Sequence, residues 1–228
     1  WPKHRDPWSL ADTLVSLAIF PLLAGSAIVS AIKLGGALEL RWHTSIPESI
    51  FFMNLYVSRA IFHMFLQCMQ EMPVSHLLLM TLHHALSVLC YAEGLRTKHM
   101  HFFGCLAGSC ETSTIFLNNL YLSKVITIGG RELKELLPSW LYALNGVCLW
   151  LSFLVFRICL FPSWLYMMYA DVVASPEATW GRATMVERYM YPGVTLFLLC
   201  LSTYWFVPIT KGMLKALGVI KKPPKTTE

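Results

Sequence analysis

Long apolar segments separated by short charged stretches constrain the fold of this 228-residue chain more than any other feature. About 20 consecutive apolar residues are needed for a helix to cross the hydrocarbon of a bilayer. Only 14% of the residues are charged, against roughly a quarter in a soluble domain, and the charges gather between the apolar segments. A large soluble core is a much weaker explanation of repeated segments of this length. The pattern therefore predicts an integral membrane protein.

The hydropathy pattern predicts an all-α, polytopic transmembrane bundle of about six spans. We expect no sheet, because unpaired backbone groups are too costly in lipid. The predicted spans are residues 10–32, 50–70, 76–91, 99–123, 138–161 and 188–209. We expect the fifth span to stop at Pro162, with residues 163–170 either in the membrane interface or in a broken helix.

The loops outside the membrane are short, and the main ones are residues 124–137 and 170–187. Neither is long enough to separate two domains, so residues 1–228 are predicted to form one transmembrane domain. A basic C-terminal tail occupies residues 210–228. Its lysines are Lys211, Lys215, Lys221, Lys222 and Lys225.

The net charge of +5 depends largely on this tail. Six spans place both termini on one side of the membrane, and that side then holds more Lys and Arg than the other. The positive-inside rule therefore predicts cytoplasmic termini. We expect no nucleic-acid partner, because no folded basic patch with interleaved aromatic residues accompanies the tail.

The cysteines all lie in apolar segments, and none forms a C-x-x-C pair. They are Cys68, Cys90, Cys105, Cys110, Cys148, Cys159 and Cys200. We interpret them as small buried hydrophobic residues, neither disulfide-bonded nor part of a metal site.

A pair of histidines, His83 and His84, stands in the third predicted span, seven residues after His76. Adjacent helical residues point about 100° apart, so one histidine can line a site while the other braces it. Histidine can act as a general base or as an acyl-accepting nucleophile. The alternative is a pair of hydrogen-bonded interior histidines. A metal site would need these histidines to converge with Glu111, and none is predicted.

A stripe of small and polar residues runs along the fourth predicted span. Its members are Gly104, Gly108, Glu111, Thr114 and Asn118. The two glycines are spaced as a small-x-x-x-small pair, which allows a neighbouring helix to approach closely. Glu111 then lies near mid-span and is expected to face the bundle, because an isolated carboxylate is costly in hydrocarbon. The alternative is a structural carboxyl group that is neutral or paired with a cation.

Arg157 in the fifth predicted span has two interpretations. It lies close to Pro162 and could extend its guanidinium to the membrane interface. Alternatively, it pairs with Glu111 or binds a lipid head group. Asn145 and Ser152 lie on a different face and could form hydrogen bonds across helices.

A further polar stripe runs along the second predicted span. It consists of Tyr56, Arg59, His63, Gln67 and Gln70. Two interpretations are open: this helix walls the same cavity as the other polar residues, or it lies along the membrane interface.

Three motifs in order along the chain resemble the TLC domain family, named for the TRAM, Lag and CLN proteins. His83 begins HHALSVL, Glu111 begins ETSTIFLNNL, and Asn145 begins NGVCLWLSFLVFRICLFP. The resemblance covers roughly residues 54–209. It implies a polytopic helical protein, usually of the endoplasmic reticulum or related membranes, that acts in lipid metabolism, lipid sensing or membrane-protein trafficking.

The ceramide synthase branch of this family is matched only in part. Its histidine pair carries over onto His83 and His84, but its His-Asp pair falls on Cys110 and Glu111, and its further Asp falls on Thr114. The E-x-S-T-x-F pattern at Glu111 looks more like the TLC-domain-containing and CLN-type branches. The synthase reaction is therefore not transferred by default.

Three hypotheses follow for the function. The first is binding or sensing of membrane lipids, which contributes to lipid or sphingolipid homeostasis, with no cofactor. Its site would be built from His84, Glu111, Thr114, Asn118, Asn145 and Arg157. The second is an N-acyltransferase that joins acyl-CoA as co-substrate to a sphingoid base, with His83, His84 and Glu111 as catalytic residues. The third is a trafficking receptor for other membrane proteins that uses the lysine tail.

Overall fold

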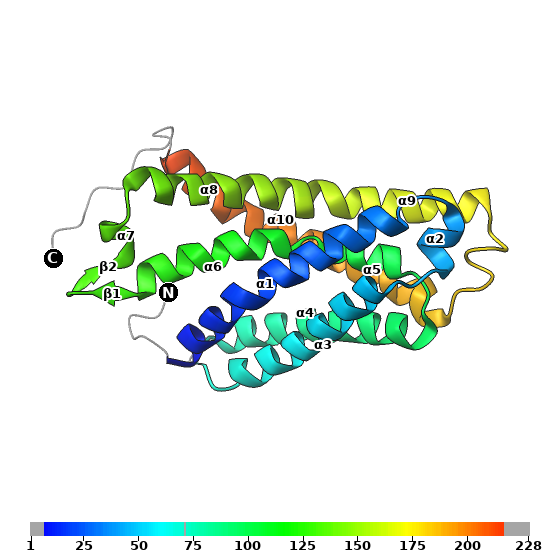
Figure 1. Ribbon diagram of the computed structural model, residues 1–228, viewed down its shortest axis with the longest axis horizontal. Coiled ribbons are helices and arrows are strands. Elements are labelled where there is room, and N and C mark those ends of the chain that lie inside the picture. The colour runs from blue at the N-terminus through cyan, green and yellow to red at the C-terminus, as the bar shows by residue number, and fades with distance from the viewer. Residues whose placement is uncertain (1–6, 71, 217–228) are drawn as a thin grey trace.

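The computed structural model describes residues 7–70 and 72–216, and its architecture is almost wholly helical (Figure 1). The all-α polytopic prediction is therefore confirmed. The helices are α1 (Pro7–Leu34), α2 (Leu38–His43), α3 (Pro47–Gln67), α4 (Val74–Thr97), α5 (His101–Gly108), α6 (Glu111–Val125), α7 (Leu133–Leu136), α8 (Ser139–Phe153), α9 (Leu160–Ala174) and α10 (Tyr191–Ala216), with the π-helical turns η1 (Leu154–Cys159) and η2 (Val186–Met190).

Five helical segments in the described part of the chain are long and apolar enough to cross a membrane. They are Pro7–Leu34, Leu38–Gln67, Val74–Thr97, Ser139–Ala174 and Val186–Lys215. The remaining predicted span, residues 99–123, is divided into α5 and α6 at Ser109 and Cys110. The Ser109 and Ser113 hydroxyls donate to the backbone carbonyls of Cys105 and Cys110. At the interruption the backbone N–H groups of Ser109 and Cys110 also donate to carbonyls three residues earlier, those of Leu106 and Ala107, as in a tightened 3₁₀ turn.

The prediction that Pro162 ends the fifth span is wrong, because the helix continues to Ala174. Proline lacks a backbone N–H, and its ring clashes with the carbonyl four residues earlier in a regular α-helix. Here the π-helical turn η1 directly precedes this region and widens the backbone spiral. The turn η2 stands in the same relation to Pro192 at the start of α10. A π turn thus lies just before each of these two prolines, where the regular α-helical hydrogen bonding has to change.

A small hairpin departs from the prediction that the protein has no sheet. Strands β1 (Thr127–Ile128) and β2 (Arg131–Glu132) pair antiparallel in the loop between α6 and α8, with Thr127 opposite Glu132. Gly129 and Gly130 connect the strands with φ values of +59° and +80°. A two-residue hairpin turn of this hand requires positive φ at both positions, which glycine adopts without strain. The hairpin lies beyond the helical bundle (Figure 1).

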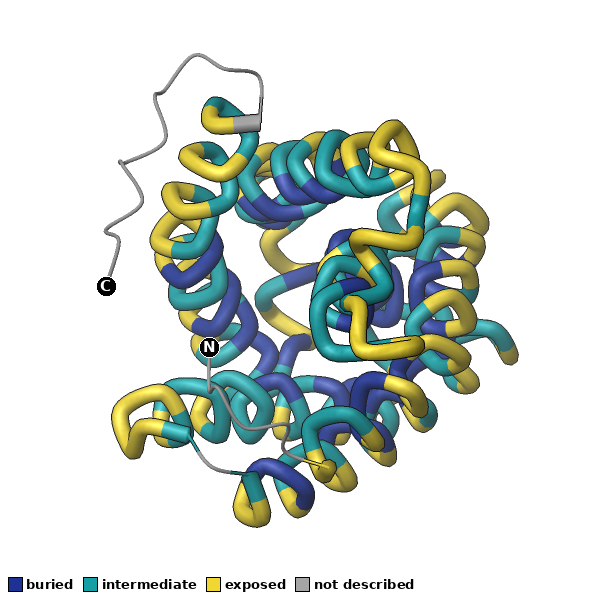
Figure 2. Tube along the Cα trace, turned by 90° about the vertical axis from the view of Figure 1, so that its left-hand side faces the viewer, coloured by how far each residue is buried: buried dark blue, intermediate teal, exposed yellow. Residues whose placement is uncertain are grey.

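Close packing occurs where α3 crosses α5. A Cβ atom added to Gly104 would lie 2.6 Å from Met53 Cε, and one added to Gly108 would lie 2.1 Å from Phe52 Cζ. Because only glycine leaves room for these side chains, the close approach predicted from the glycine pair is confirmed. Buried residues face the inside of the bundle, and many of the exposed ones on its outside are large and apolar, as suits contact with lipid (Figure 2).

All seven cysteines are free thiols, but not all are buried as predicted. Cys105 and Cys110 are buried, whereas Cys68, Cys159 and Cys200 are exposed on the outer faces of the helices. In a membrane bundle the outside is as apolar as the core, so a small hydrophobic residue is tolerated on either side.

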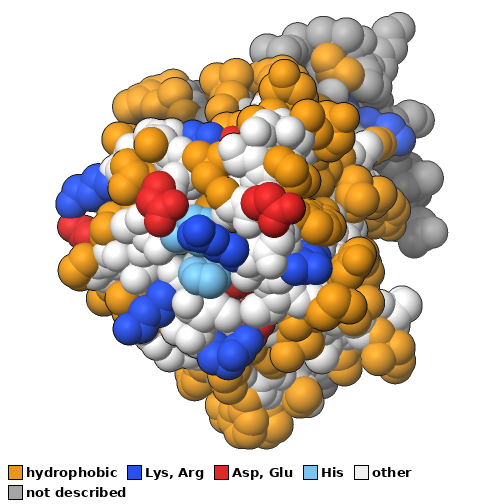
Figure 3. Space-filling model, turned by 90° about the vertical axis from the view of Figure 1, so that its right-hand side faces the viewer, with side chains coloured by type: hydrophobic (Ala, Val, Ile, Leu, Met, Phe, Trp, Pro, Cys, Tyr) orange, Lys and Arg blue, Asp and Glu red, His pale blue; other side chains and the backbone are white. Residues whose placement is uncertain are grey.

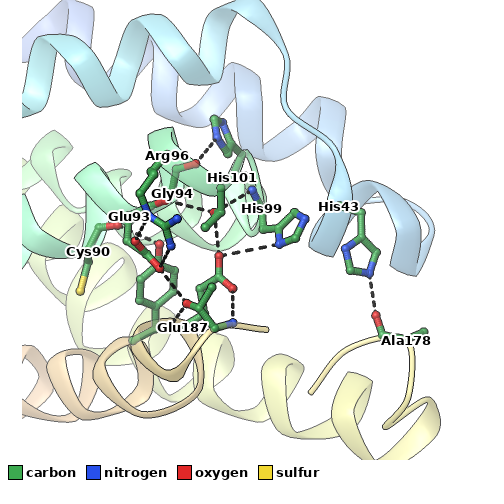
Figure 4. Close-up of polar contacts among 12 residues, drawn as sticks. His43, Cys90, Glu93, Gly94, Arg96, His99, His101, Ala178 and Glu187 are labelled. Atoms are coloured by element: carbon green, nitrogen blue, oxygen red, sulfur yellow. Dashed lines mark hydrogen bonds and ion pairs between the residues drawn. The ribbon is translucent and has the colours of Figure 1, made fainter. Parts of the chain in front are cut away.

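One end of the bundle, which we call the charged end, gathers α2, the α4–α5 link and the segment between α9 and α10. Figure 3 shows basic, acidic and histidine side chains collected on this face. The fully buried carboxylate of Glu187 accepts hydrogen bonds from Thr97 Oγ1 and from the backbone N–H of Thr184, each at 2.7 Å. Thr184 also donates to Glu93, and Glu93 accepts two hydrogen bonds of 2.7 Å from Arg96 (Figure 4).

A second carboxylate at the charged end is equally well paired. Asp171 accepts hydrogen bonds from both Arg41 and the indole of Trp42. His101 is fully buried between the Ser49 hydroxyl and the Gly94 carbonyl, at 2.7 Å and 3.0 Å. Glu187, Asp171 and His101 are therefore paired with groups from other segments, and these hydrogen bonds tie α2, α3, the α4–α5 link, α9 and the segment before α10 together.

Candidate functional site

A cavity of about 830 Å³ opens inside the opposite half of the bundle. Helices α1, α3, α4, α10, α8 and α6 contact one another in that order around it, and α6 closes the ring against α1. Figure 2 views the molecule from this end, where α1 begins and α10 ends. Most of the wall is apolar. Its polar and ionisable members are Asp12, Ser16, Tyr56, Arg59, His63, His76, His83, His84, Glu111, Thr114, Asn118, Lys124, Tyr142 and Arg157.

An ion pair between α1 and α3 forms the first polar group of the wall. Arg59 Nη2 donates to Asp12 Oδ1 and to Ser16 Oγ, each at 2.7 Å. The other carboxylate oxygen of Asp12 lies 2.8 Å from His63 Nδ1, and Gln67 contacts the far nitrogen of that ring at 2.8 Å. The second predicted span thus walls the cavity and does not lie along the membrane interface.

A row of three imidazole rings continues the wall from α3 to α4. The ring of His63 lies 4.8 Å from that of His84, which in turn lies 4.7 Å from that of His83. Trp205 of α10 packs edge-on against His83 at 6.4 Å. Both histidines of the pair therefore line the cavity, where the sequence suggested that one would line it and the other would brace it.

A second polar group joins α6 to the long α8–α9 helix. Glu111 Oε2 accepts a hydrogen bond of 2.8 Å from Thr114, whose hydroxyl in turn accepts one of 3.2 Å from Arg157. Arg157 also donates to Ser113 at 2.8 Å and lies 5.1 Å above the ring of Phe153. Thr114 thus links the predicted pair of Glu111 and Arg157.

The interpretation that Arg157 extends to the membrane interface is wrong. Its side chain is buried, with 8% exposed. The helix that carries it runs on to Ala174, so Arg157 lies in the interior of a long span and not near its end. An arginine at such a depth is stabilised by polar partners within the bundle.

The two asparagines of the predicted lipid site have different environments. Asn118 of α6 lines the cavity, and its Nδ2 has no hydrogen-bond partner among the described residues. Asn145 of α8 is not part of the cavity wall and donates to the backbone carbonyl of Phe116 at 3.0 Å. The structure therefore brings together His84, Glu111, Thr114, Asn118 and Arg157 but not Asn145, which ties α8 to α6.

Sequence reasoning missed the contribution of α1. Asp12 and Ser16 are both buried and hold the guanidinium of Arg59. The available signal was an acidic residue just inside an otherwise apolar predicted span. Within the ranges 7–70 and 72–216, no group of three His, Cys, Asp or Glu side chains is placed to hold a metal ion.

The ring of helices and the polar cavity within it define a polytopic membrane protein with an intramembrane site. The chain belongs to the TLC domain family, whose model matches residues 38–211. The match extends beyond the 54–209 range of the recognised motifs, yet α1, with Asp12 and Ser16, precedes it. No solved structure matches the chain.

Proposed function

We propose that this protein binds a membrane lipid in the cavity and thereby contributes to lipid or sphingolipid homeostasis in the endoplasmic reticulum or a related membrane. The observation that carries the proposal is the cavity of about 830 Å³ inside the membrane-spanning helices. Small-molecule sites typically occupy roughly 300–1,000 Å³ and combine an apolar wall with a few convergent polar groups. The apolar wall suits an acyl chain, and the polar groups suit its head.

The polar groups of the wall also support binding over a purely structural role. His83 Nδ1, His84 Nδ1 and Asn118 Nδ2 are buried without a hydrogen-bond partner in the described part of the chain. A buried polar group without a partner destabilises the fold unless something satisfies it. A bound lipid head would supply such a partner.

The N-acyltransferase hypothesis ranks second, because both histidines line the same cavity as Glu111. Acyl transfer to an amine needs a base and a preorganised set of groups around it. Here Glu111 accepts a hydrogen bond from Thr114, and the ring of His84 packs between His63 and His83. Among the described residues, therefore, no carboxylate is hydrogen-bonded to His83 or His84 to orient the pair.

A radiolabelled acyl-CoA assay in reconstituted membranes separates the two hypotheses. We expect little or no ceramide from wild type. Strong ceramide formation that is lost in both His84→Ala and Glu111→Gln, or an acyl adduct on His83 or His84, would establish the enzyme hypothesis instead. The trafficking hypothesis stays a prediction, since residues 217–228 of its lysine tail lie outside the described residues.

Lipid binding itself is tested with two matched glycine variants. A Cβ added to Gly146 or to Gly25 meets nothing within 4 Å, but only Gly146 lines the cavity. We expect Gly146→Phe to fill the cavity and reduce the lipid that co-purifies in mild detergent, measured by mass spectrometry. Gly25→Phe should retain it. Equal lipid content in both variants and wild type would show that the cavity is not the binding site.

A further inference from the structure

We propose that the lipid bound in the cavity has an acidic head, whose phosphate or carboxylate oxygens accept hydrogen bonds from the wall. This inference rests on the proposed function, because it names the chemical class of the lipid held in the same cavity. It follows from which polar groups of the wall are already paired and which are not.

Arg59 is the first observation. It lines the cavity and is 6% exposed, yet only its Nη2 is bonded, to Asp12 and Ser16. Its Nε and Nη1 have no hydrogen-bond partner among residues 7–70 and 72–216. A guanidinium can only donate hydrogen bonds, so these two nitrogens require acceptor atoms. Oxygens of a phosphate or carboxylate are the strongest acceptors for arginine.

The other unpaired groups of the wall are compatible with the same ligand. Asn118 Nδ2 is a further donor without a partner in the described chain. His83 and His84 each have an unpartnered Nδ1, and a neutral imidazole can donate or accept there according to its tautomer. The wall therefore contains donors that need an acceptor, together with imidazoles that adapt to either role.

The formal charges of the wall point the same way. Its two buried guanidinium groups, those of Arg59 and Arg157, balance its two carboxylates, those of Asp12 and Glu111, so the wall has no surplus of negative charge to hold a cationic head. Both carboxylates already have partners, since Asp12 binds Arg59 and Glu111 binds Thr114. An ammonium head would have to compete with Arg59 for Asp12. An anionic head would instead meet Nε and Nη1 of Arg59, which have no partner in the described part of the chain, so the wall favours it over the ammonium head of a sphingoid base.

The two arginines lie near different rings of the imidazole row. Arg59 is close enough to interact electrostatically with His84, and Arg157 with His83. Since α1 holds Arg59 through Asp12 and Ser16, these two residues position the first cation without being required to touch the lipid. The selectivity for an acidic head would thus depend partly on a helix that precedes the TLC family match.

Binding of four matched probes tests the inference on the full chain in nanodiscs. The probes are oleate, 1-oleoyl lysophosphatidate, neutral monooleoylglycerol and sphingosine. We expect the two acidic lipids to bind more tightly than the neutral lipid and the amine. Tighter or equal binding of monooleoylglycerol or sphingosine would overturn the acidic head while leaving lipid binding intact. If none of the probes bound and no lipid co-purified, the proposed function itself would fail.

Inorganic phosphate distinguishes a lipid head from a free anion. We expect it to compete poorly with lysophosphatidate, because it has no chain for the apolar wall. Competition at equal concentration would show a soluble-anion site and overturn the proposal.

Two double variants remove matched ion pairs. Asp12→Asn with Arg59→Gln removes the pair in the wall and should weaken oleate binding roughly tenfold or more, as expected for lost charge-assisted hydrogen bonds. Binding of monooleoylglycerol should change little. Lys33→Gln with Glu48→Gln removes an exposed pair at the charged end and should leave both affinities unchanged. If the first double variant does not fold, Asn118→Leu replaces it, because this variant keeps the ion pair. Asn118→Leu should lower oleate affinity several-fold. Unchanged oleate binding in the variant that folds would refute the proposal.

Discussion

Glu187 at the charged end and Arg59 in the cavity wall are both buried ionic groups, yet their surroundings differ. Glu187 is fully buried and accepts hydrogen bonds on both of its oxygens. Arg59 is 6% exposed, and among residues 7–70 and 72–216 only one of its three nitrogens has a hydrogen-bond partner. Completed networks give a segment one rigid arrangement, whereas partly completed ones leave buried groups that a ligand can satisfy. The comparison separates a polar cluster that holds the fold from one that is built for a ligand.

The largest expected effect is a loss of stability when the buried carboxylate of the charged end is removed. Glu187→Ala removes the acceptor of the Thr97 hydroxyl and of the Thr184 N–H, and leaves both in a closed environment. We expect a loss of about 3 kcal/mol in the free energy of unfolding, seen as a lower midpoint in thermal unfolding followed by circular dichroism. Lipid selectivity should be retained by the folded fraction.

The control for this loss is Glu48→Ala. Glu48 is 38% exposed and paired with exposed Lys33, so its removal should cost far less stability than the removal of Glu187. If the midpoint of thermal unfolding of Glu187→Ala were no lower than that of this control, the polar groups of the charged end would not stabilise the fold as proposed.

A pair of glycine substitutions gives the next largest effect. Gly108→Ala places a Cβ 2.1 Å from Phe52 Cζ and should destabilise by about 1–3 kcal/mol, because Phe52 is fully buried and has little room to move. Gly146→Ala faces open space beside the cavity and should stabilise by up to about 1 kcal/mol, through the higher helix propensity of alanine. Thermal unfolding of the two variants measures this difference. Equal destabilisation by both would indicate that the cavity is filled by side chains in solution.

Asn118→Leu should give the smallest change in stability, and it distinguishes most clearly between a structural and a lipid-binding role for Asn118. Leucine has the same number and branching of side-chain heavy atoms, and it removes a buried donor that has no partner among the described residues. We expect the lipid-free protein to be equally stable or up to about 1 kcal/mol more stable, while lipid affinity falls. Thermal unfolding and oleate binding, measured on the same variant, check that stability does not fall while affinity does. A clear loss of stability without loss of binding would place Asn118 in the structural class with Glu187.

Much of the fold was predictable because helix formation in a membrane depends on local composition. The spans beginning at residues 10, 50, 76 and 188 all correspond to helices, since each apolar segment must satisfy its backbone internally. Besides the hairpin, the prediction was wrong at Pro162 and at Ser109–Cys110, and both errors concern how a helix adjusts its backbone hydrogen bonds along its length. Those adjustments depend on packing against neighbours and have no unique sequence signal.

For the candidate site, the sequence pointed to the polar residues on α4, α6 and the α8–α9 helix. It did not show which other residues they contact. His84, Glu111 and Arg157 stood out because each is polar within an apolar span. Asp12 was overlooked, and Asn145 was grouped with residues whose cavity it does not line. The direct pairing of Glu111 with Arg157 considered from the sequence is instead made through Thr114.

The sequence by itself determined that this chain is embedded in a membrane, that it is helical and that its polar residues face inward, because hydrocarbon penalises unsatisfied polar groups wherever they occur. Only the tertiary structure decided which of those groups satisfy one another. That outcome depends on contacts between helices far apart in the chain: α1 holds Arg59 of α3, and α3 is set against the glycines of α5. Hydrogen bonds require atoms to meet within about 3 Å, and no periodicity along a single helix specifies such a distance.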